Sequence, residues 1–221
     1  MSQMSTRMKR PFDVIGAIGG LIFFAPVMAA IAAAILVADG RPLLFRQTRL
    51  GRGRRPFTIL KFRTMRNEEA IALGQWLRAT GLDELPQLVN VLWGELSAVG
   101  PRPLIEADVR RRGWTDPAYD FRWSVPPGLT GLAQVVGARS ARHALRLDRL
   151  YIARQSLRLD IRLVAWSFAV NLLGKTRVQC LISRRADTAP SISATSSHRA
   201  GPARPTTGRA RACRDASPPR A

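Results

Sequence analysis

The amino-acid sequence predicts an α-rich α+β protein that inserts into a membrane from one face through a kinked helix. Three observations predict this fold class: an uncharged apolar segment near the N-terminus, a short β-hairpin pattern, and several segments with helical spacing of apolar residues. We expect a membrane region over residues 1–40 and a folded domain over 41–177. Residues 178–221, which are dominated by Ser, Thr, Pro, Ala, Gly and Arg, predict a basic disordered tail.

The apolar segment covers residues 14–37, which contain no charged side chain. About 20 apolar residues suffice to cross the bilayer core as a helix. Basic residues flank both ends, and positively charged flanks tend to stay cytoplasmic, so the two ends favour the same side. Pro26 lies near the middle and should kink the helix. A kinked re-entrant helix satisfies both observations, while a kinked spanning helix and a signal peptide are the alternatives. The flanking basic residues are Arg7, Lys9 and Arg10 before the segment, and Arg41, Arg46, Arg49, Arg52, Arg54 and Arg55 after it.

Next along the chain, residues 43–65 predict a β-hairpin. The Gly51-Arg52-Gly53 turn separates two short strand-like stretches, and Phe57 to Phe62 would form the second strand. Residues 68–80 carry apolar residues at roughly helical spacing and predict a helix.

Helical spacing continues in the second half of the chain. Residues 84–97 place their apolar side chains on one helix face, and residues 105–122 are also helix-prone. Gly/Pro-rich loops at 99–104 and 126–131 follow these two segments. Residues 145–174 are amphipathic, which fits either a helix lying in the lipid headgroup layer or an ordinary surface helix on a core.

The charge composition predicts an anionic partner. The chain carries 35 Lys and Arg against 15 Asp and Glu, a formal net charge of +20. Nucleic acid, a phospholipid surface and a phosphorylated substrate all fit such an excess. Two cysteines and two histidines, far apart in the sequence, indicate neither a disulfide framework nor a zinc site.

The acidic pair Asp83-Glu84 stands out in this arginine-rich chain. Pro86 suits a first helical turn, so Asp83 could simply be the N-cap of a helix. Alternatively, the helix dipole and neighbouring basic residues would keep the Asp83 carboxylate ionised. An ionised carboxylate can attack phosphorus and hold a covalent intermediate, and a second carboxylate can help to bind a divalent ion. The residues alone leave both interpretations open.

Three basic residues suit phosphate binding. Lys61 and Arg63 alternate along a strand and would point to one face, where paired cations fit a diphosphate. Arg102 lies between two prolines on a stiffened loop, which suits bidentate phosphate contact. A solvated strand face is the alternative for the first pair.

Several ordered motifs resemble the bacterial sugar transferases, the small monotopic phosphoglycosyl transferases. The resemblance covers roughly residues 8–175. The motifs are Lys9-Arg10-Pro-Phe-Asp13, Phe45-Arg-Gln47 with Arg49 and Gly51, Lys61-Phe-Arg-Thr-Met65, Leu82-Asp-Glu-Leu-Pro-Gln-Leu88, Gly100-Pro-Arg-Pro103, Pro127-Gly-Leu-Thr-Gly-Leu-Ala-Gln134, and Asp148 with Tyr151, Ser156, Leu159 and Asp160.

The resemblance implies a reaction in two steps. Asp83 attacks the β-phosphate of a UDP-sugar and releases UMP, and polyprenyl (undecaprenyl) phosphate then takes the phosphosugar from the aspartyl enzyme. Mg2+ is required, with Asp83 and Glu84 as its carboxylates. Initiation of exopolysaccharide, capsule, O-antigen or glycoprotein glycan assembly follows as the expected role.

The resemblance also implies binding residues and a location. Substrate phosphates would contact Lys61, Arg63, Arg102, Thr130, Gln134 and Arg139, and Pro26 would be the membrane-helix kink. We expect the active site on the cytoplasmic face of the bacterial inner membrane, in contact with anionic lipids, with residues 5 and 50 both cytoplasmic. The chain departs from the family pattern in the shorter stretch over residues 66–81, in Gly81 and in residues 136–139.

Two other functions compete with transfer of a phosphosugar. A membrane-anchored nucleic-acid-binding protein would explain the charge but not Asp-Glu-Leu-Pro, and no nucleic-acid motif is present. The second competing function is that of a scaffold, served by a homologue that has lost activity. We expect no nucleic-acid partner, and the sequence leaves the sugar, the pathway and the oligomeric state open.

Overall fold

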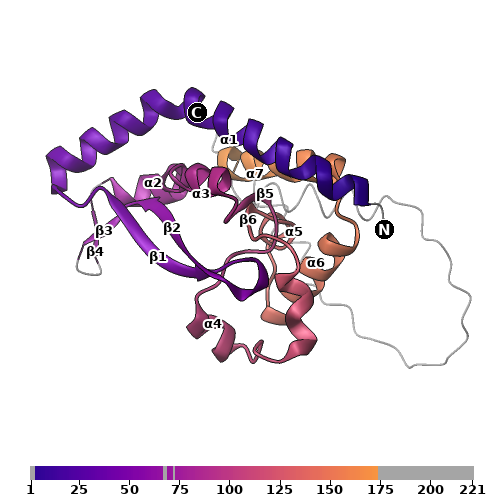
Figure 1. Cartoon of the computed structure of the whole chain (residues 1–221). Helices are drawn as coiled ribbons and strands as arrows, with labels where there is room; N and C mark the ends of the chain where they lie inside the picture. The colour runs from indigo at the N-terminus through magenta and orange to yellow at the C-terminus, as the bar shows by residue number, and fades with distance from the viewer. Residues whose placement is uncertain (1–2, 67–68, 72, 174–221) are drawn as a thin grey trace, which may run out of the picture.

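A computed structural model describes residues 3–66, 69–71 and 73–173 of the chain (Figure 1). The helices are α1 (Gln3–Asp39), α2 (Gly74–Thr80), α3 (Gln87–Trp93), α4 (Glu106–Arg111), α5 (Leu132–Val136), α6 (Ala141–Ala153) and α7 (Leu157–Leu173), with short 3-10 helices η1 (Arg52–Arg54), η2 (Leu82–Glu84) and η3 (Pro117–Trp123). The strands are β1 (Leu44–Leu50), β2 (Pro56–Phe62), β3 (Met65–Arg66), β4 (Glu69–Ala70), β5 (Ser97–Val99) and β6 (Gly128–Thr130). The predicted tail over residues 178–221 lies outside the described residues.

Helix α1 is long, apolar and bent near its middle (Figure 1). Pro26 lies inside it, and a proline cannot donate the hydrogen bond to the preceding turn, which accounts for a bend there. The predicted kink is therefore present. The two halves of α1 diverge along the protein from this bend and do not fold back on each other (Figure 1).

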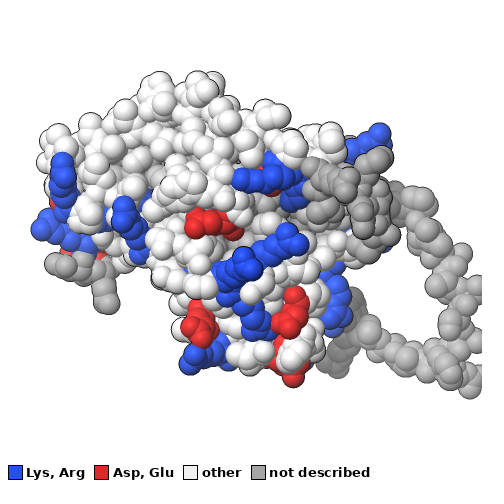
Figure 2. All heavy atoms as spheres, in the orientation of Figure 1, with Lys and Arg blue, Asp and Glu red and all other residues white. Residues whose placement is uncertain are grey.

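One face of α1 packs on the domain and the other is exposed. Ala17 packs in a core cluster with β2 and α3, and Ile31 and Ile35 pack in a second cluster with β2 and α2. On the outer face, Ile22 is 72% and Phe23 73% exposed. Figure 2 shows the outer arc of α1 without charged side chains.

Among the described residues, Met8–Asp39 is the one helical stretch long and apolar enough to cross a membrane. Only 11% of its most apolar part is buried. A core helix of a soluble protein would be mostly covered, so this exposure fits a surface that meets lipid.

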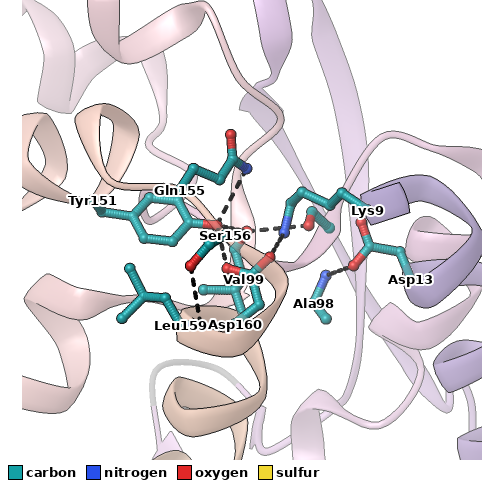
Figure 3. Close-up of polar contacts among 10 residues, drawn as sticks. Lys9, Asp13, Ala98, Val99, Tyr151, Gln155, Ser156, Leu159 and Asp160 are labelled. Atoms are coloured by element: carbon teal, nitrogen blue, oxygen red, sulfur yellow. Dashed lines mark hydrogen bonds and ion pairs between the residues drawn. The ribbon is translucent and has the colours of Figure 1, made fainter. Parts of the chain in front are cut away.

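The start of α1 is tied to the domain by buried polar contacts (Figure 3). Lys9 forms a 2.6 Å ion pair with Asp160 of α7. The Tyr151 hydroxyl donates to the same carboxylate at 2.8 Å, and Asp13 accepts a hydrogen bond from the Ala98 amide at 3.0 Å. Burial and the adjacent Asp160 raise the pKa of Tyr151, so its hydroxyl stays a donor.

The end of α1 is tied to the same domain. Asp39 pairs with Arg63 at 2.6 Å, and Arg63 also donates to the carbonyls of Asp39 and Gly40, each at 2.9 Å. Near the start, Arg10 donates to the carbonyls of Val91 and Leu92 at the end of α3. Contacts at both ends hold α1 along one side of the domain.

Strands β1 and β2 form the predicted antiparallel hairpin, with Leu44 opposite Phe62 and Leu50 opposite Pro56. Gly53 in the turn has φ +62°, a conformation that glycine adopts without strain. The hairpin prediction for residues 43–65 is confirmed.

A second, parallel pair brings two distant loops together. β5 pairs with β6 through Ser97–Gly128 and Val99–Thr130. The loops that follow, which start at Gly100 and Gly131, therefore lie side by side. A Cβ on Gly128 would lie 2.6 Å from the carbonyl carbon of Val99, so only glycine permits this approach.

Several predicted helices are shorter than the sequence indicated. The helix expected over 68–80 begins only at Gly74, after the small β3–β4 ribbon. The helix expected over 84–97 covers Gln87–Trp93 and ends at Gly94, whose φ is +84°. Two local features account for the shorter helices. The β3–β4 pairing occupies the chain before α2 begins, and the left-handed Gly94 ends α3.

The two later helical segments are both divided. The segment over 105–122 separates into α4 and η3 around Gly113, whose φ is +68°. The segment over 145–174 separates into α6 and α7, with the Ser156 hydroxyl accepting from the Leu159 amide at the start of α7. Tyr151 and Leu163 bury one face of these helices against β5 and α5, so both are packed on the core.

We predict that Asp160→Ala strongly destabilises the protein. Removal of the carboxylate leaves Lys9 buried without a counter-charge, which typically costs about 3–5 kcal/mol. Thermal unfolding in detergent micelles measures the change.

Asp120→Ala is the matched control, because the Asp120–Arg54 pair is largely exposed and should contribute less than about 1 kcal/mol. Equal effects of the two substitutions would contradict the role assigned to the buried pair.

Candidate active site

A cavity of about 1180 Å3 opens between the hairpin, η2, the loops after β5 and β6, and the start of α6. All the candidate catalytic and binding residues line it, although they come from five separate stretches of the chain. They are Lys61, Arg63, Asp83, Glu84, Arg102, Thr130, Gln134 and Arg139.

Asp83 lies on η2, directly after the left-handed Gly81 that ends α2. It is 8% exposed and does not cap α3, whose N-cap residue is Pro86. The capping interpretation is therefore wrong. Because η2 has only three residues, it offers little of the dipole that the prediction invoked.

The electrostatic surroundings of Asp83 also differ from the prediction. Burial is the largest effect and raises the pKa of Asp83, while Lys61 and Arg78 oppose this rise and Glu84 adds to it. The net direction is upward. A buried carboxylate that is weakly solvated is a better nucleophile than one in open water, provided that it is ionised.

Glu84 pairs with Lys61 at 2.5 Å, and both side chains are partly buried. Lys61 extends from the end of β2, and it also lowers the pKa of Asp83. One lysine thus compensates two adjacent carboxylates, which would otherwise repel each other.

Arg63 does not face the same partner as Lys61. Its guanidinium is committed to Asp39 and to the carbonyls at the end of α1, although it lines the cavity. The pairing of Lys61 and Arg63 as one diphosphate clamp stays a prediction, and the structure gives Arg63 a second task in fixing α1.

The remaining candidates come from the two loops and α5. Arg102 is exposed on the Pro101–Pro103 segment, and Thr130 is the last residue of β6. Gln134 donates to the Leu129 carbonyl at 3.3 Å, while its side-chain oxygen is buried at the cavity without a hydrogen-bond partner. Arg139 is exposed on the loop before α6.

Four arginines of the cavity wall were not singled out as binding residues. Arg49 lies on β1, Arg78 on α2, Arg112 after α4 and Arg122 on η3. Burial lowers the pKa of Arg49, as does the neighbouring charge of Arg102. Arg49 belongs to a motif that carried the family resemblance, so the sequence could have identified it as a candidate binding residue. No local pattern in the sequence indicated that Arg78 and Arg112 would line the cavity.

The residues present fit a magnesium ion that is shared with a substrate, not a self-contained metal site. Within the described residues, no three His, Cys, Asp or Glu side chains form a group that could hold a metal. Mg2+ is often bound through one or two carboxylates together with substrate phosphates and water. Asp83 and Glu84 supply such a pair, with Glu84 at present satisfied by Lys61.

Comparisons with known proteins give consistent matches. The family model described as bacterial sugar transferase matches residues 4–174. A UDP-glucose:undecaprenyl-phosphate glucose-1-phosphate transferase from Caulobacter vibrioides is 40% identical, over 71% of this chain and 66% of the relative.

Two further relatives differ in name and length. A UDP-N-acetylgalactosamine-undecaprenyl-phosphate N-acetylgalactosaminephosphotransferase from Aeromonas hydrophila is 35% identical over 75% of this chain and 44% of its own length. An exopolysaccharide production protein from Rhizobium leguminosarum bv. phaseoli is 35% identical over 73% of this chain and 93% of its own length. The match therefore spans only part of the two transferases.

We predict that Asp83→Asn raises the unfolding temperature at neutral pH. A carboxyl group whose pKa is raised by folding binds its proton more tightly in the folded state, so its contribution to stability is lost as pH rises toward the folded pKa. The neutral amide avoids this unfavourable ionisation. Differential scanning fluorimetry at several pH values measures the effect, and the two proteins should converge in acid.

Glu84→Gln is the matched control, and it should lower the unfolding temperature because it removes the partner of Lys61. A decrease for Asp83→Asn instead would mean that the Asp83 carboxylate stabilises the fold.

Proposed function

Because this chain belongs to the bacterial sugar transferase family, we propose that it transfers a sugar 1-phosphate from a UDP-sugar to undecaprenyl phosphate and releases UMP. The names of its relatives state this class of substrate. The observation that carries the proposal is the buried Asp83 on the wall of a large cavity whose other charged side chains are mostly basic.

The first step joins the donor to the enzyme. A carboxylate oxygen of Asp83 attacks the β-phosphorus of the UDP-sugar, and the bond from that phosphorus to the oxygen bridging the two phosphates breaks. UMP leaves with the bridging oxygen, and the phosphosugar remains on Asp83. Arg49 and Arg102 are placed to bind the negative charge on the transferring and leaving phosphates.

The second step regenerates the enzyme. A phosphate oxygen of undecaprenyl phosphate attacks the same phosphorus, and the bond to the Asp83 oxygen breaks. The product is an undecaprenyl diphosphate sugar, and no water or further reactant is consumed.

Glu84 and a magnesium ion would assist both steps. Asp83 and Glu84 would hold Mg2+ together with substrate phosphates, and the ion would supply positive charge that neutralises the diphosphate. Lys61 keeps Glu84 oriented through its ion pair.

The arrangement of α1 supports a monotopic membrane attachment. Lys9 near its start and Asp39 at its end both contact the same domain, so the two ends of the helix lie on one side of any membrane that the exposed face enters. We expect the active site on the cytoplasmic face of the bacterial inner membrane, where UDP-sugars are made and anionic lipids match the basic domain.

The product class fits the first step of a polysaccharide assembly. One relative is an exopolysaccharide production protein, which favours exopolysaccharide over the other glycans considered. UDP-glucose and UDP-N-acetylgalactosamine are the first donors to test, because they occur in the names of the transferases with 40% and 35% identity.

We predict that the protein releases UMP from one UDP-sugar in a panel and that Asp83→Asn abolishes turnover. Without undecaprenyl phosphate, wild-type protein should release about one equivalent of UMP and retain the phosphosugar, seen as a mass increase of the intact chain. UMP release and intact-protein mass spectrometry provide the two measurements.

Asp120→Asn, at an exposed position, is the matched control and should keep normal turnover. Near-normal activity of Asp83→Asn would refute the covalent mechanism. Failure of every UDP-sugar, together with salt-sensitive binding of duplex DNA, would replace the transferase proposal by a nucleic-acid-binding function.

We predict that Ser5 near the start of α1 and Arg52 in the hairpin that follows α1 are both accessible from the cytoplasm. Ser5→Cys and Arg52→Cys, in a chain whose native Cys180 and Cys213 are replaced by serine, should resist a membrane-impermeant thiol reagent in intact cells and react in inverted vesicles. A periplasmic cysteine protein verifies the reagent. Labelling of residue 5 alone in intact cells would exclude the re-entrant arrangement.

A further inference from the structure

The segment Pro101–Pro103 is held by three hydrogen bonds to consecutive carbonyl groups. The Pro101 carbonyl accepts from the Gly128 amide at 3.0 Å, and the Pro103 carbonyl accepts from the Arg49 guanidinium at 3.4 Å. Between them, the Arg102 carbonyl accepts from Nη2 of Arg122 at 2.6 Å, the shortest of the three. Neither proline has an N–H, so donors from outside must fix this backbone.

Arg122 is itself firmly held. It is 4% exposed, and its Nε donates to the buried carboxylate of Asp148 at 2.9 Å. Its guanidinium also lies over the rings of Trp114 and Trp123, at 5.3 and 5.1 Å from their centroids. A guanidinium with fixed partners on its edge and on its faces has little freedom to move.

Arg102 needs such support because its own side chain is exposed and lines the cavity beside Glu84. A long flexible side chain is useful for phosphate recognition only when its backbone is held close to the productive orientation. Two donors of Arg122, Nε and Nη2, are instead directed to Asp148 and to the Arg102 carbonyl, which fixes its guanidinium behind the segment that carries Arg102.

We propose that Arg122 is a positioning residue, which orients Arg102 toward the substrate phosphates through the hydrogen bond to the Arg102 carbonyl. The pair Arg122–Asp148 then couples η3 and α6 to the phosphate-binding loop. This inference rests on the proposed transferase function, because it assigns Arg102 a phosphate of the UDP-sugar.

The sharpest variant is Arg122→Lys, which keeps the positive charge near Asp148 but cannot donate to both Asp148 and the Arg102 carbonyl in the same planar geometry. We expect kcat/KM for the UDP-sugar to fall about tenfold, mostly through KM, with wild-type protein as reference. Arg110→Lys, at an exposed position on α4, is the matched control and should leave turnover unchanged.

A double-mutant cycle separates positioning from general stabilisation. In an Arg102→Ala background, Arg122→Lys should change kcat/KM by less than about twofold, because the group on which it acts is gone. An undiminished tenfold loss in that background would overturn the proposal.

Pro103→Ala keeps the inference testable if Arg122→Lys does not fold. It loosens the same segment without touching the buried pair, and we expect it to raise KM as Arg122→Lys does. Unchanged KM in a folded Pro103→Ala protein would also overturn the proposal.

Hydrogen exchange of the substrate-free protein distinguishes failure of this inference from failure of the proposed function. The Gly128 amide, which donates to the Pro101 carbonyl, should exchange faster in Arg122→Lys than in wild type. Unchanged exchange counts against the inference even if wild-type protein is active. Faster exchange supports the structural part of the inference even if no UDP-sugar is turned over.

Discussion

The ion pair between Lys9 and Asp160 joins the apolar helix α1 to α7, and much of the structure depends on it. Both partners are buried, and Tyr151 donates a further hydrogen bond to the carboxylate. If either partner were lost, water could not solvate the remaining buried charge. Together with Arg63 and Asp39 at the other end, this pair fixes α1 along one side of the domain. The exposed apolar face of α1 is thereby directed away from the core, and the active-site cavity keeps a constant position relative to that face.

A second electrostatic balance operates inside the cavity. Burial favours the neutral form of Asp83, and Lys61 restores part of the preference for the anion while it neutralises Glu84. The site therefore holds a weakly solvated carboxylate, the proposed nucleophile, beside Glu84, whose charge Lys61 balances. Arginines from several elements surround this pair, so a diphosphate entering the cavity finds positive charge on more than one side.

The side of the cavity that carries Arg102 and Thr130 is built on two short parallel strands. The pairing of β5 with β6 places the loop at Gly100 beside the loop at Gly131, and Arg122 reaches the Arg102 carbonyl from a third element. Backbone groups thus carry the geometry, while the side chain of Arg102 remains available. Such a division between rigid backbone and free guanidinium suits the proposed binding of first a nucleotide and then a lipid phosphate.

The sequence by itself determined the apolar helix with its proline, the hairpin around Gly53, and eight of the residues that line the cavity, because each depends on local composition, turn chemistry or an ordered motif. Tertiary structure alone decided what each of those residues contacts. Arg63 pairs with Asp39 whereas Lys61 pairs with Glu84, and Asp83 is buried in a 3-10 turn instead of capping a helix. The physical reason is that burial and charge pairing depend on residues far apart in the chain, whereas periodicity and capping rules describe only near neighbours.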